Sequence, residues 1–372
     1  LQLSCMTMAH LLRVLGARVE YENGSMSIDS KDVCYCEAPY ELVSKMRASI
    51  YVLGPLLARL KEARVSFPGG CAIGTRPVDL HLKALEALGA KIEIEHGYIH
   101  ATADKLTGGD VHFEKSSVGA TINTLMAAVF ARGTTRLFNA AMEPEVDSTI
   151  DLLNKMGAKI SGQGSTTLFI EGVDDLFPVE MPMIPDRIEA GTFLVAGALS
   201  SEPVTVTNCE PAHLTILLDK LRETGCEIQI LGQDITISAP SKIKATNILT
   251  LPYPGFPTDL QAQFTVLMSL ADGISFIEDT IFPDRFMHVA ELNRLQANIK
   301  IERNVACVKG VKNLSGAEVM ATDLRASAAL VLAGMVAEGT TTVSRIYHID
   351  RGYDRIEEKL NSIGAKITRE IG

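Results

Sequence analysis

One cysteine lies in a loop whose composition is unusual enough to suggest chemistry. Residues 68–81 read PGGCAIGTRPVDLH and lie between a strand-like and a helix-like segment. The first ten of these residues contain three glycines and two prolines, which indicates an unusual backbone path. Because Arg76 is close in sequence, the Cys71 thiol is a candidate acid or nucleophile, with a structurally inert cysteine as the alternative. The loop matches neither a Walker A motif nor a dinucleotide fingerprint.

A second set of candidate residues marks the start of five apolar, helix-like segments. These starts are Arg47-Ala48-Ser49, Ser117-Val118-Gly119, Asp186-Arg187, Thr258-Asp259 and Thr322-Asp323-Leu324-Arg325. Free N–H groups at helix N-termini attract anions, and arginine adds a bidentate hold on phosphate or carboxylate. The alternative is that Ser, Thr and Asp here are ordinary N-caps. It explains the arginines less well, because a helix N-terminus disfavours a cation unless an anion lies beside it.

These starts belong to a pattern that recurs six times along the chain. An amphipathic helical stretch ends in Gly-Ala or a variant of it, and an alternating, hairpin-like stretch follows. Subtracting successive positions gives spacings of 68 to 73 residues between Gly16, Gly89, Gly157, Gly225, Gln296 and Gly364. Glycine at a helix end accepts the left-handed conformation without a Cβ clash. The period is too long for a solenoid of single hairpins and predicts a compact βαβ-type unit.

The pattern predicts six first helices but only five of the more apolar second helices. We expect the missing second helix to precede residue 1, since the chain opens with Leu1 and not with Met. Pseudo-threefold symmetry would bring the second-helix N-termini together at the centre of each domain. Two such domains facing each other would form an anion-binding cleft.

Chain length predicts two domains. A chain of 372 residues exceeds one ordinary core. We expect a first domain at 1–184, which carries the cysteine loop 68–77, and a second domain at 185–372. Two prolines interrupt the pattern between Met181 and Arg187, where the boundary is expected.

Charge and cysteine usage argue against several classes of function. A net charge of −10 opposes general binding to nucleic acid or acidic membranes. No apolar run reaches the roughly 18 residues of a membrane span without polar interruption. Seven scattered cysteines, an odd number, are typical of the reducing cytoplasm. The eight histidines show no metal-ligand spacing, so no metal site is expected.

Four segments together resemble a known enzyme family. They are PGGCAIGTRPVDLH at 68–81, FPTDLQAQF at 256–264, TDLRASAALVLAG at 322–334 and HIDRGYDRIEEKL at 348–360. They are similar to signature segments of the UDP-N-acetylglucosamine 1-carboxyvinyltransferases, the enolpyruvyl transferases that open bacterial peptidoglycan synthesis. The resemblance covers essentially the whole chain. It implies an α/β (α+β) fold of two inside-out barrels, each built from three βαβαββ units with helices inside and sheets outside.

The resemblance also implies a reaction. Phosphoenolpyruvate and the 3-hydroxyl of UDP-N-acetylglucosamine would give an enolpyruvyl ether and phosphate through a tetrahedral ketal. No metal or organic cofactor would take part, and the partners would be these two small molecules. A cytoplasmic, monomeric enzyme that is a target of fosfomycin is expected.

The catalytic roles implied by the resemblance fall on five residues. Cys71 looks like the loop thiol that delivers a proton to the methylene carbon of phosphoenolpyruvate and can form a covalent adduct with it. A thiol with an ordinary pKa is largely protonated at neutral pH, which suits an acid. Asp259 looks like the base near the sugar 3-hydroxyl. Arg76, Arg351 and Arg47 look like the residues that hold phosphoenolpyruvate and the ketal.

Further residues resemble the family's substrate contacts. In the second domain, Arg285 and the segment Asp323 to Arg325 look like contributors to the closed site, where their arginines would offset the charge of phosphate and carboxylate. Ile281 resembles the family residue whose backbone contacts the sugar. Arg187 and Glu189 lie near the domain boundary. The uridine stretch corresponds to Pro77, Val78, Asp79 and Leu80, and the diphosphate contact to Lys115, Ser117, Val118 and Gly119.

The chain departs from the family in one respect. The family carries a Lys-Asn pair at the start of the helix that is expected to precede residue 1, and neither residue occurs here. Weak turnover is therefore expected of this chain alone, and near-normal rates would contradict that. In the full-length protein, the domains are expected to close when nucleotide sugar binds.

Three other functions compete with this one. The shikimate-pathway sister enzyme shares the repeats but lacks the PGGC loop. A silent nucleotide-sugar binder would have little reason to keep Cys71, Asp259 and the arginines. An RNA-processing module conflicts with the charge of −10 and lacks an aromatic stacking set.

Overall fold

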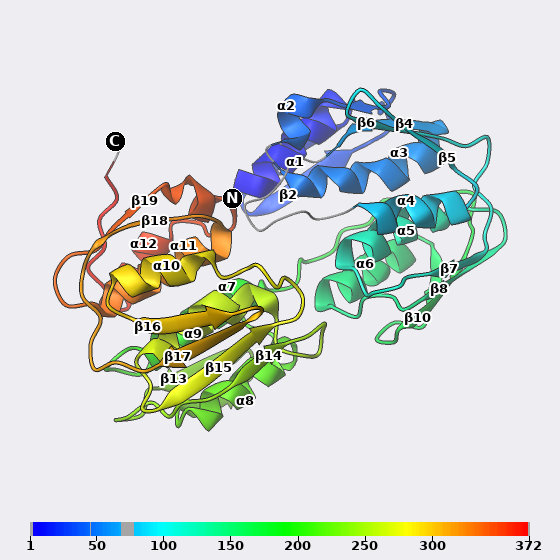
Figure 1. Ribbon diagram of the computed structural model, residues 1–372. Coiled ribbons are helices and arrows are strands. Elements are labelled where there is room, and N and C mark those ends of the chain that lie inside the picture. The colour runs from blue at the N-terminus through cyan, green and yellow to red at the C-terminus, as the bar shows by residue number, and fades with distance from the viewer. Residues whose placement is uncertain (1–2, 45, 68–77, 371–372) are drawn as a thin grey trace. The chain divides into compact units, whose positions relative to one another are not determined.

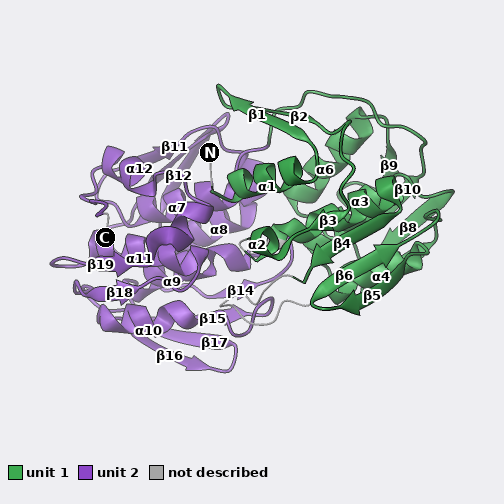
Figure 2. Ribbon diagram, turned by 90° about the horizontal axis from the view of Figure 1, so that it is seen from above, with its two compact units in different colours: residues 1, 3–71, 75–183 green, residues 2, 72–74, 184–372 purple. Residues whose placement is uncertain are grey.

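The computed structural model describes residues 3–44, 46–67 and 78–370. The chain divides into two compact units, one ending at Met183 and the other beginning at Ile184 (Figure 2). Between β10 (Thr167–Glu171) and α7 (Arg187–Ala198) there is no helix or strand, so the proline-interrupted segment is irregular, as expected.

The predicted helices are present in the predicted order (Figure 1). The first helices of the repeats are α1 (Leu3–Val14), α4 (Asp79–Ala87), α6 (Pro144–Lys155), α8 (Thr215–Glu223), α10 (Met287–Arg294) and α12 (Ile356–Ser362). The second helices are α3 (Leu53–Leu60), α5 (Val118–Ala128), α7, α9 (Gln261–Ser269) and α11 (Leu324–Val336). A short helix α2 (Tyr40–Val43) and the 3-10 turns η1 (Arg47–Val52), η2 (Pro211–Leu214), η3 (Thr258–Leu260) and η4 (Ile346–Arg351) complete the helical elements of the described residues.

The strands form separate small sheets. In the first unit, one four-stranded sheet has the strand order β3 (Glu37–Ala38), β4 (Glu62–Ser66), β6 (Tyr98–Thr102), β5 (Lys91–Glu95). A second four-stranded sheet has the order β7 (Asp110–His112), β8 (Thr134–Phe138), β10, β9 (Lys159–Ser161). The strands β1 (Arg18–Glu22) and β2 (Ser25–Asp29) form a two-stranded hairpin. In the second unit, a three-stranded sheet has the strand order β11 (Val204–Val206), β13 (Asp234–Ser238), β12 (Glu227–Leu231). A four-stranded sheet has the order β14 (Ile248–Thr250), β15 (Ile274–Asp279), β17 (Val305–Lys309), β16 (Asn298–Glu302). The strands β18 (Glu318–Met320) and β19 (Thr342–Ser344) form a two-stranded sheet.

Each four-stranded sheet is one complete βαβαββ unit. In the sheet that contains β14, strand β15 is parallel to β14 across the crossover helix α9 and antiparallel to β17. Parallel neighbours need such a crossover, whereas the hairpin β16–β17 needs only a turn. The pattern predicts six units, the first of them incomplete at its N-terminus, and among the described residues three units are complete. The others lack a first strand or a hairpin, and residues 365–370 form no strand.

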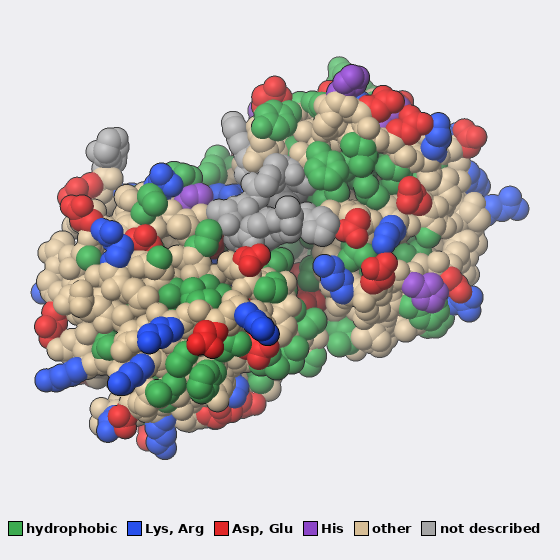
Figure 3. All heavy atoms as spheres, in the orientation of Figure 1, with side chains coloured by type: hydrophobic (Ala, Val, Ile, Leu, Met, Phe, Trp, Pro, Cys, Tyr) green, Lys and Arg blue, Asp and Glu red, His purple; other side chains and the backbone are tan. Residues whose placement is uncertain are grey.

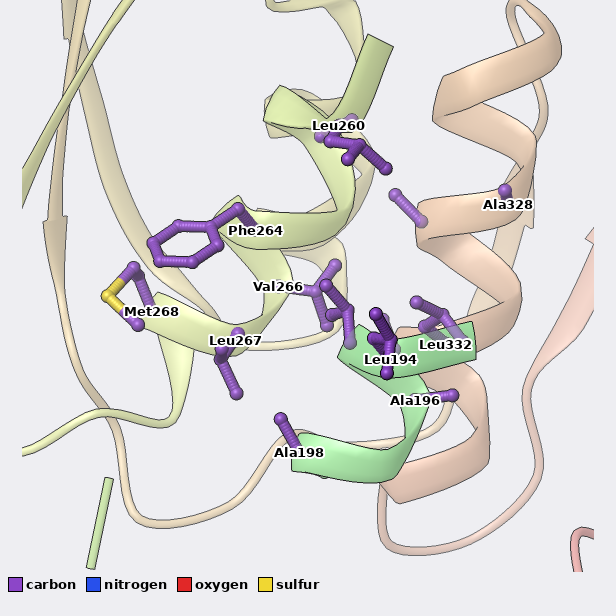
Figure 4. Close-up of a cluster of buried hydrophobic side chains, with 14 of the residues drawn as sticks. Leu194, Ala196, Ala198, Leu260, Phe264, Val266, Leu267, Met268, Ala328 and Leu332 are labelled. Atoms are coloured by element: carbon purple, nitrogen blue, oxygen red, sulfur yellow. The ribbon is translucent and has the colours of Figure 1, made fainter. Parts of the chain in front are cut away.

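The core of the second unit lies between its apolar second helices. All nine residues of α9 are buried, and α7 and α11 are buried on nearly every face. A helix that is apolar all round must lie inside. Figure 4 shows side chains of α7, α9 and α11 meeting, among them Leu194, Val266 and Leu332.

The outer faces of the sheets remain open to solvent. Along β15, Ser275, Ile277 and Asp279 face inward, while Ile274 and Phe276 are exposed. In Figure 3, apolar side chains lie among charged ones over this part of the second unit. The helices-inside, sheets-outside arrangement is therefore confirmed within this unit.

The helix ends that define the repeat share one backbone conformation. The φ angle is positive at Gly16, Gly89, Gly157, Gly225 and Gly364, with values of 94° to 107°. The divergent copy keeps this turn, since Gln296 has a φ of 68°. The predicted left-handed ends are confirmed, including the one without glycine.

Gly89→Ala tests the backbone origin of these ends. A Cβ at Gly89 would meet nothing within 4 Å, so only the φ of 94° opposes alanine. We expect a loss of about 1–2 kcal/mol in the free energy of unfolding, measured by urea titration. Gln296→Ala is the control, because its φ of 68° is one that non-glycine residues already adopt there. Equal losses in both variants would contradict this explanation.

Candidate functional site

In the second unit, one carboxylate lies between two arginines. Arg285 Nη1 donates to Asp259 Oδ1 at 2.6 Å, and Arg325 Nη2 lies 3.5 Å from Asp259 Oδ2. The arginine side chains are only 7% and 13% exposed, whereas that of Asp259 is 40% exposed. We call these three residues the arginine–aspartate cluster. Within this cluster the carboxylate is the group most exposed to solvent, and the two guanidinium groups are buried.

Three elements far apart in the sequence bring the cluster together. Asp259 is the second residue of η3, which leads into α9. Arg325 is the second residue of α11, and Arg285 belongs to the connection between β15 and α10. The predicted meeting of second-helix starts is therefore observed for α9 and α11. An ion pair with Asp259 also satisfies the physical requirement for a cation at the start of α11.

A buried hydrogen-bond network supports the cluster from beneath. Arg325 Nη1 donates to the Tyr353 hydroxyl at 3.2 Å, and that hydroxyl lies 2.8 Å from Thr192 Oγ1. Gln263 Nε2 donates to Thr192 Oγ1 at 3.1 Å and to the Asp259 carbonyl oxygen at 3.0 Å. Helices α7, α9 and α11 are thus joined by polar contacts inside an apolar core, where unpaired polar groups would be costly.

Two of the helix N-termini are already occupied by their own side chains. Asp186 Oδ1 accepts hydrogen bonds from the N–H groups of Ile188 and Glu189, both at 2.9 Å. Asp323 Oδ1 accepts from the N–H groups of Arg325 at 2.9 Å and Ala326 at 3.2 Å. The expectation of free N–H groups for an anion is wrong at α7 and α11, because the aspartates satisfy those donors. Any anion held there must bind the guanidinium groups.

The alternative N-cap interpretation also needs a correction. The N-cap of η3 is Pro257, and that of α11 is Asp323. Thr258 and Thr322 are therefore not caps. Thr258 has another partner, because its hydroxyl donates to Asp279 Oδ2 at 2.7 Å.

Burial and neighbouring charges set the protonation states around the cluster. Burial alone would lower the pKa of Arg325, but Tyr353, Asp259 and Asp186 together raise it above its usual value. Burial lowers the pKa of His288 to about 4; Asp323 opposes this shift and Arg285 adds to it. At neutral pH the cluster therefore contains charged arginines beside a neutral histidine.

Other predicted residues of the second unit lie near these elements. Arg351 is the last residue of η4. Burial is the main cause of the lowered pKa of His348, and the charge of Arg351 lowers it further. Arg187 begins α7, with its guanidinium carbon 5.8 Å from the centre of the Tyr253 ring. The Ile281 N–H donates to Asp279, and Glu189 forms an ion pair with Lys359 at 2.6 Å.

The first unit has its own group of predicted residues. Val78 is the N-cap of α4, and Asp79 and Leu80 open that helix. A side-chain oxygen of Asp79 is buried without a hydrogen-bond partner among the described residues. An unpaired buried acceptor is unusual and suits a ligand donor.

The start of α5 lies against α4 in the same unit. Lys115 precedes this helix, and the Ser117 hydroxyl caps it by accepting from Ala120 N at 3.3 Å. Val118 and Gly119 open α5, and a Cβ on Gly119 would meet the His81 ring at 3.1 Å. The predicted uridine and diphosphate residues thus come from two adjacent helix starts.

Several predicted residues cannot be placed. Cys71, Arg76 and Pro77 lie outside the described residues, as does the side chain of Arg47, whose backbone begins η1. Their assigned roles stay predictions.

Sequence analysis missed Asp279, Gln263, Thr192 and Tyr353. Gln263 is four residues after Asp259 along the same helical stretch, so helical spacing could have identified it. Asp279 follows Ser275 and Ile277 at strand spacing, which places a charge on the buried face of β15. No local signal joins Thr192 to Tyr353, because they are distant in the chain.

Neither a membrane-spanning helix nor a metal site occurs among the described residues. None of the helices described is long and apolar enough to cross a membrane. Within the same residues, no three His, Cys, Asp or Glu side chains are grouped so that they could hold a metal ion.

Comparison with solved structures gives the class of protein. The enolpyruvyl transferase NikO from Streptomyces tendae superimposes with a TM-score of 0.88 at 25% identity, covering 98% of this chain and 87% of that one. EPSP synthase from Acinetobacter baumannii shares the fold, with a TM-score of 0.72 at 18% identity over 97% of this chain and 87% of that one. The fold is that of the enolpyruvyl transferases.

Sequence comparison gives the family. The EPSP synthase (3-phosphoshikimate 1-carboxyvinyltransferase) family model matches residues 3–360, and the chain belongs to this family. A UDP-N-acetylglucosamine 1-carboxyvinyltransferase from Desulfosudis oleivorans is 57% identical, covering 96% of this chain and 86% of its own length. One of the same name from Myxococcus xanthus is 54% identical, covering 98% of this chain and 87% of its own length.

The buried histidine predicts a pH dependence of stability. The unfolded chain binds a proton at His288 below about pH 6.5, whereas the folded chain does so only below about 4. Stability from this group is therefore lost as pH falls through that window, at about 1.4 kcal/mol per pH unit. Urea titrations at pH 7, 6 and 5 should show a smaller loss for His288→Leu than for wild type. The exposed His10→Gln is the control, and equal slopes in wild type and His288→Leu would contradict the prediction.

Proposed function

We propose that this chain transfers the enolpyruvyl group of phosphoenolpyruvate to the 3-hydroxyl of UDP-N-acetylglucosamine and releases phosphate. The relatives that are 53% to 57% identical over nearly the whole chain carry the name of this activity. The observation that carries the proposal is the open Asp259 carboxylate in front of two buried guanidinium groups. Such a set suits proton removal beside an anionic substrate.

In the proposed reaction, Asp259 accepts the proton of the sugar 3-hydroxyl. The sugar oxygen then bonds to C2 of phosphoenolpyruvate, and C3 receives a proton from Cys71, which gives a tetrahedral ketal. A C3 proton then returns to the Cys71 thiolate while phosphate departs with the proton that Asp259 had taken, which restores the double bond and yields the enolpyruvyl ether. Atoms and charge balance without an oxidant or a metal.

The arginines have an electrostatic role in this proposal. Arg285 and Arg325 would offset the negative charge of phosphate, carboxylate and ketal. Fixed cations in a partly desolvated site act more strongly than they would in water. They now contact Asp259, so an entering anionic substrate would compete with the carboxylate for them. Arg76, Arg351 and Arg47 are proposed to add to this positive field.

The nucleotide sugar is proposed to bind the first unit. Its uridine would lie against Val78, Asp79 and Leu80, where the unpaired Asp79 oxygen could accept the imide N–H. The diphosphate would lie at the start of α5, between Lys115 and Ser117. The enzyme would work in the cytoplasm as a monomer in peptidoglycan synthesis.

The alternative acceptor is shikimate 3-phosphate, as the name of the matching family suggests. The two activities can be distinguished by measuring phosphate release from phosphoenolpyruvate with each acceptor in turn. The complete encoded protein should release phosphate with UDP-N-acetylglucosamine and not with shikimate 3-phosphate. The opposite preference would refute the proposed acceptor.

Asp259→Asn tests the base. Because the amide cannot accept the hydroxyl proton, kcat should fall by about 10²–10⁴-fold, measured by the same phosphate release. Asp219→Asn is a matched control, since Asp219 is an exposed carboxylate of α8 that pairs with Arg222. A similar kcat for Asp259→Asn and wild type would exclude Asp259 as the base.

The Cys71 role predicts selective alkylation by an epoxide phosphonate of the fosfomycin type. The phosphonate would bind the arginines and place the epoxide beside the thiolate, which opens the ring to form a thioether. Peptide mass mapping after incubation should find the added mass on the peptide containing Cys71. A label on Cys307 or Cys209 instead would contradict the assignment, and Cys71→Asp should be resistant.

A further inference from the structure

Asp279 is a buried carboxylate that accepts four hydrogen bonds. It is the last residue of β15 and is fully buried. Its Oδ1 accepts from Thr250 Oγ1 at 2.8 Å, from Ile281 N at 3.0 Å and from Phe282 N at 2.8 Å. Its Oδ2 accepts from Thr258 Oγ1 at 2.7 Å. So many donors around one buried side chain hold its two oxygens in one orientation.

Thr258 links this carboxylate to the arginine–aspartate cluster. Its hydroxyl donates to Asp279 and accepts from Arg285 Nη1 at 3.1 Å. The same Arg285 nitrogen donates to Asp259 Oδ1 at 2.6 Å. The bonds therefore share one direction, from guanidinium to hydroxyl to carboxylate, and such aligned chains strengthen one another.

Asp279 also holds the connection that carries Arg285. Its bonds to the N–H groups of Ile281 and Phe282 fix the first turn after β15. The Arg285 N–H then donates to the Phe282 carbonyl oxygen at 2.9 Å, and the guanidinium carbon lies 5.7 Å from the centre of the Phe282 ring. One carboxylate thus fixes both the backbone and the side chain of Arg285.

We propose that Asp279 is a positioning residue for the transfer reaction, which acts through Thr258 and Arg285 to orient Asp259. The inference rests on the proposed role of Asp259 as the base. Arg285 contacts the Asp259 carboxylate directly and is linked to the buried Asp279 carboxylate through the Thr258 hydroxyl. With Asp279 in place, the arginine is partly neutralised and its hold on the base is limited.

The charges around Asp259 determine what loss of Asp279 would do. Arg285 and Arg325 contact Asp259, while Tyr353 and Asp186 act on Arg325. Neutral His288 lies near Arg285 and also near Asp323. Removing the Asp279 carboxylate breaks the link through Thr258, and Arg285 then interacts more strongly with Asp259. The base then becomes weaker, and the acidic limb of its pH profile moves to lower pH.

Asp279→Asn is the direct test in the complete encoded protein. The amide oxygen can still accept from Thr250 and the two N–H groups, so the turn is kept. The amide NH₂ cannot accept from Thr258, which breaks the chain to Arg285. We expect kcat for phosphate release with UDP-N-acetylglucosamine to fall about 10–100-fold. KM for the nucleotide sugar should change little, and the acidic limb of kcat/KM should shift downward.

Thr258 variants make the test independent of whether Asp279→Asn folds. Thr258→Val removes the same link and should reproduce the loss of kcat, whereas Thr258→Ser keeps the hydroxyl and should restore most of it. The double variant Asp279→Asn/Thr258→Val should be no slower than either single variant, because the two residues act in one chain.

Thr250→Val is the matched control. It removes another hydroxyl bond to the same carboxylate but leaves the link to Arg285 intact. It should lower the unfolding midpoint in urea while kcat and the pH profile stay near wild type.

Two results would overturn the inference. One is equal loss of kcat in Asp279→Asn and Thr250→Val without a shift of the pH profile, and the other is additive losses for Asp279→Asn and Thr258→Val. Both require a wild-type enzyme that uses UDP-N-acetylglucosamine. A wild type that does not use it would instead refute the proposed function.

Discussion

The structure of the second unit depends on how two buried arginines are neutralised. Removing a guanidinium from water costs on the order of several kcal/mol, and only close anions and hydrogen-bond acceptors offset that cost. Asp259 contacts both arginines, Tyr353 accepts from Arg325, and Thr258 accepts from Arg285. Because Asp259 is the most exposed member, the requirement for neutralisation is met at the surface where a substrate can enter.

The repeat explains how such a cluster arises from one architectural unit. Aspartates occur near the starts of α7, α9 and α11, at equivalent positions of the pattern. Asp186 and Asp323 are N-caps and are occupied by their own helices. Asp259 lies two residues beyond its cap, Pro257, so its carboxylate faces the arginines instead. The structural aspartates and the proposed base therefore differ by two positions relative to the N-cap of their helices.

Capping also determines which groups remain for an anion. The N–H donors at α7 and α11 are satisfied internally, so the backbone contributes little there. The guanidinium groups, held by Tyr353 at Arg325 and by Thr258 at Arg285, become the principal donors. This arrangement fixes their direction, because each buried contact restricts the arginine side chain. Rigid positive charge is what a transfer through an anionic ketal would need.

The sequence alone determined the repeat, the left-handed helix ends, the buried second helices and the identity of Asp259, Arg285 and Arg325 as candidates. The repeat, the helix ends and the second helices depend on local backbone preferences and on the periodicity of apolar residues, both of which can be read along the chain. Asp259 and Arg325 were candidates because they lie at second-helix starts, whereas Arg285 was a candidate only through the resemblance to the family. Sequence analysis left the N-termini of α7 and α11 open to an anion, whereas their own aspartates occupy them.

Only the tertiary structure decided which carboxylate is open, which caps its own helix and which lies buried at Asp279. Thr192 and Tyr353 are separated by 161 residues, and Thr258 and Asp279 by 21, yet each pair shares a hydrogen bond. Such partners are selected by the packing of helices and strands from different repeats. The physical reason is that a buried polar group must find its partner in space, and neighbours in space need not be neighbours in sequence.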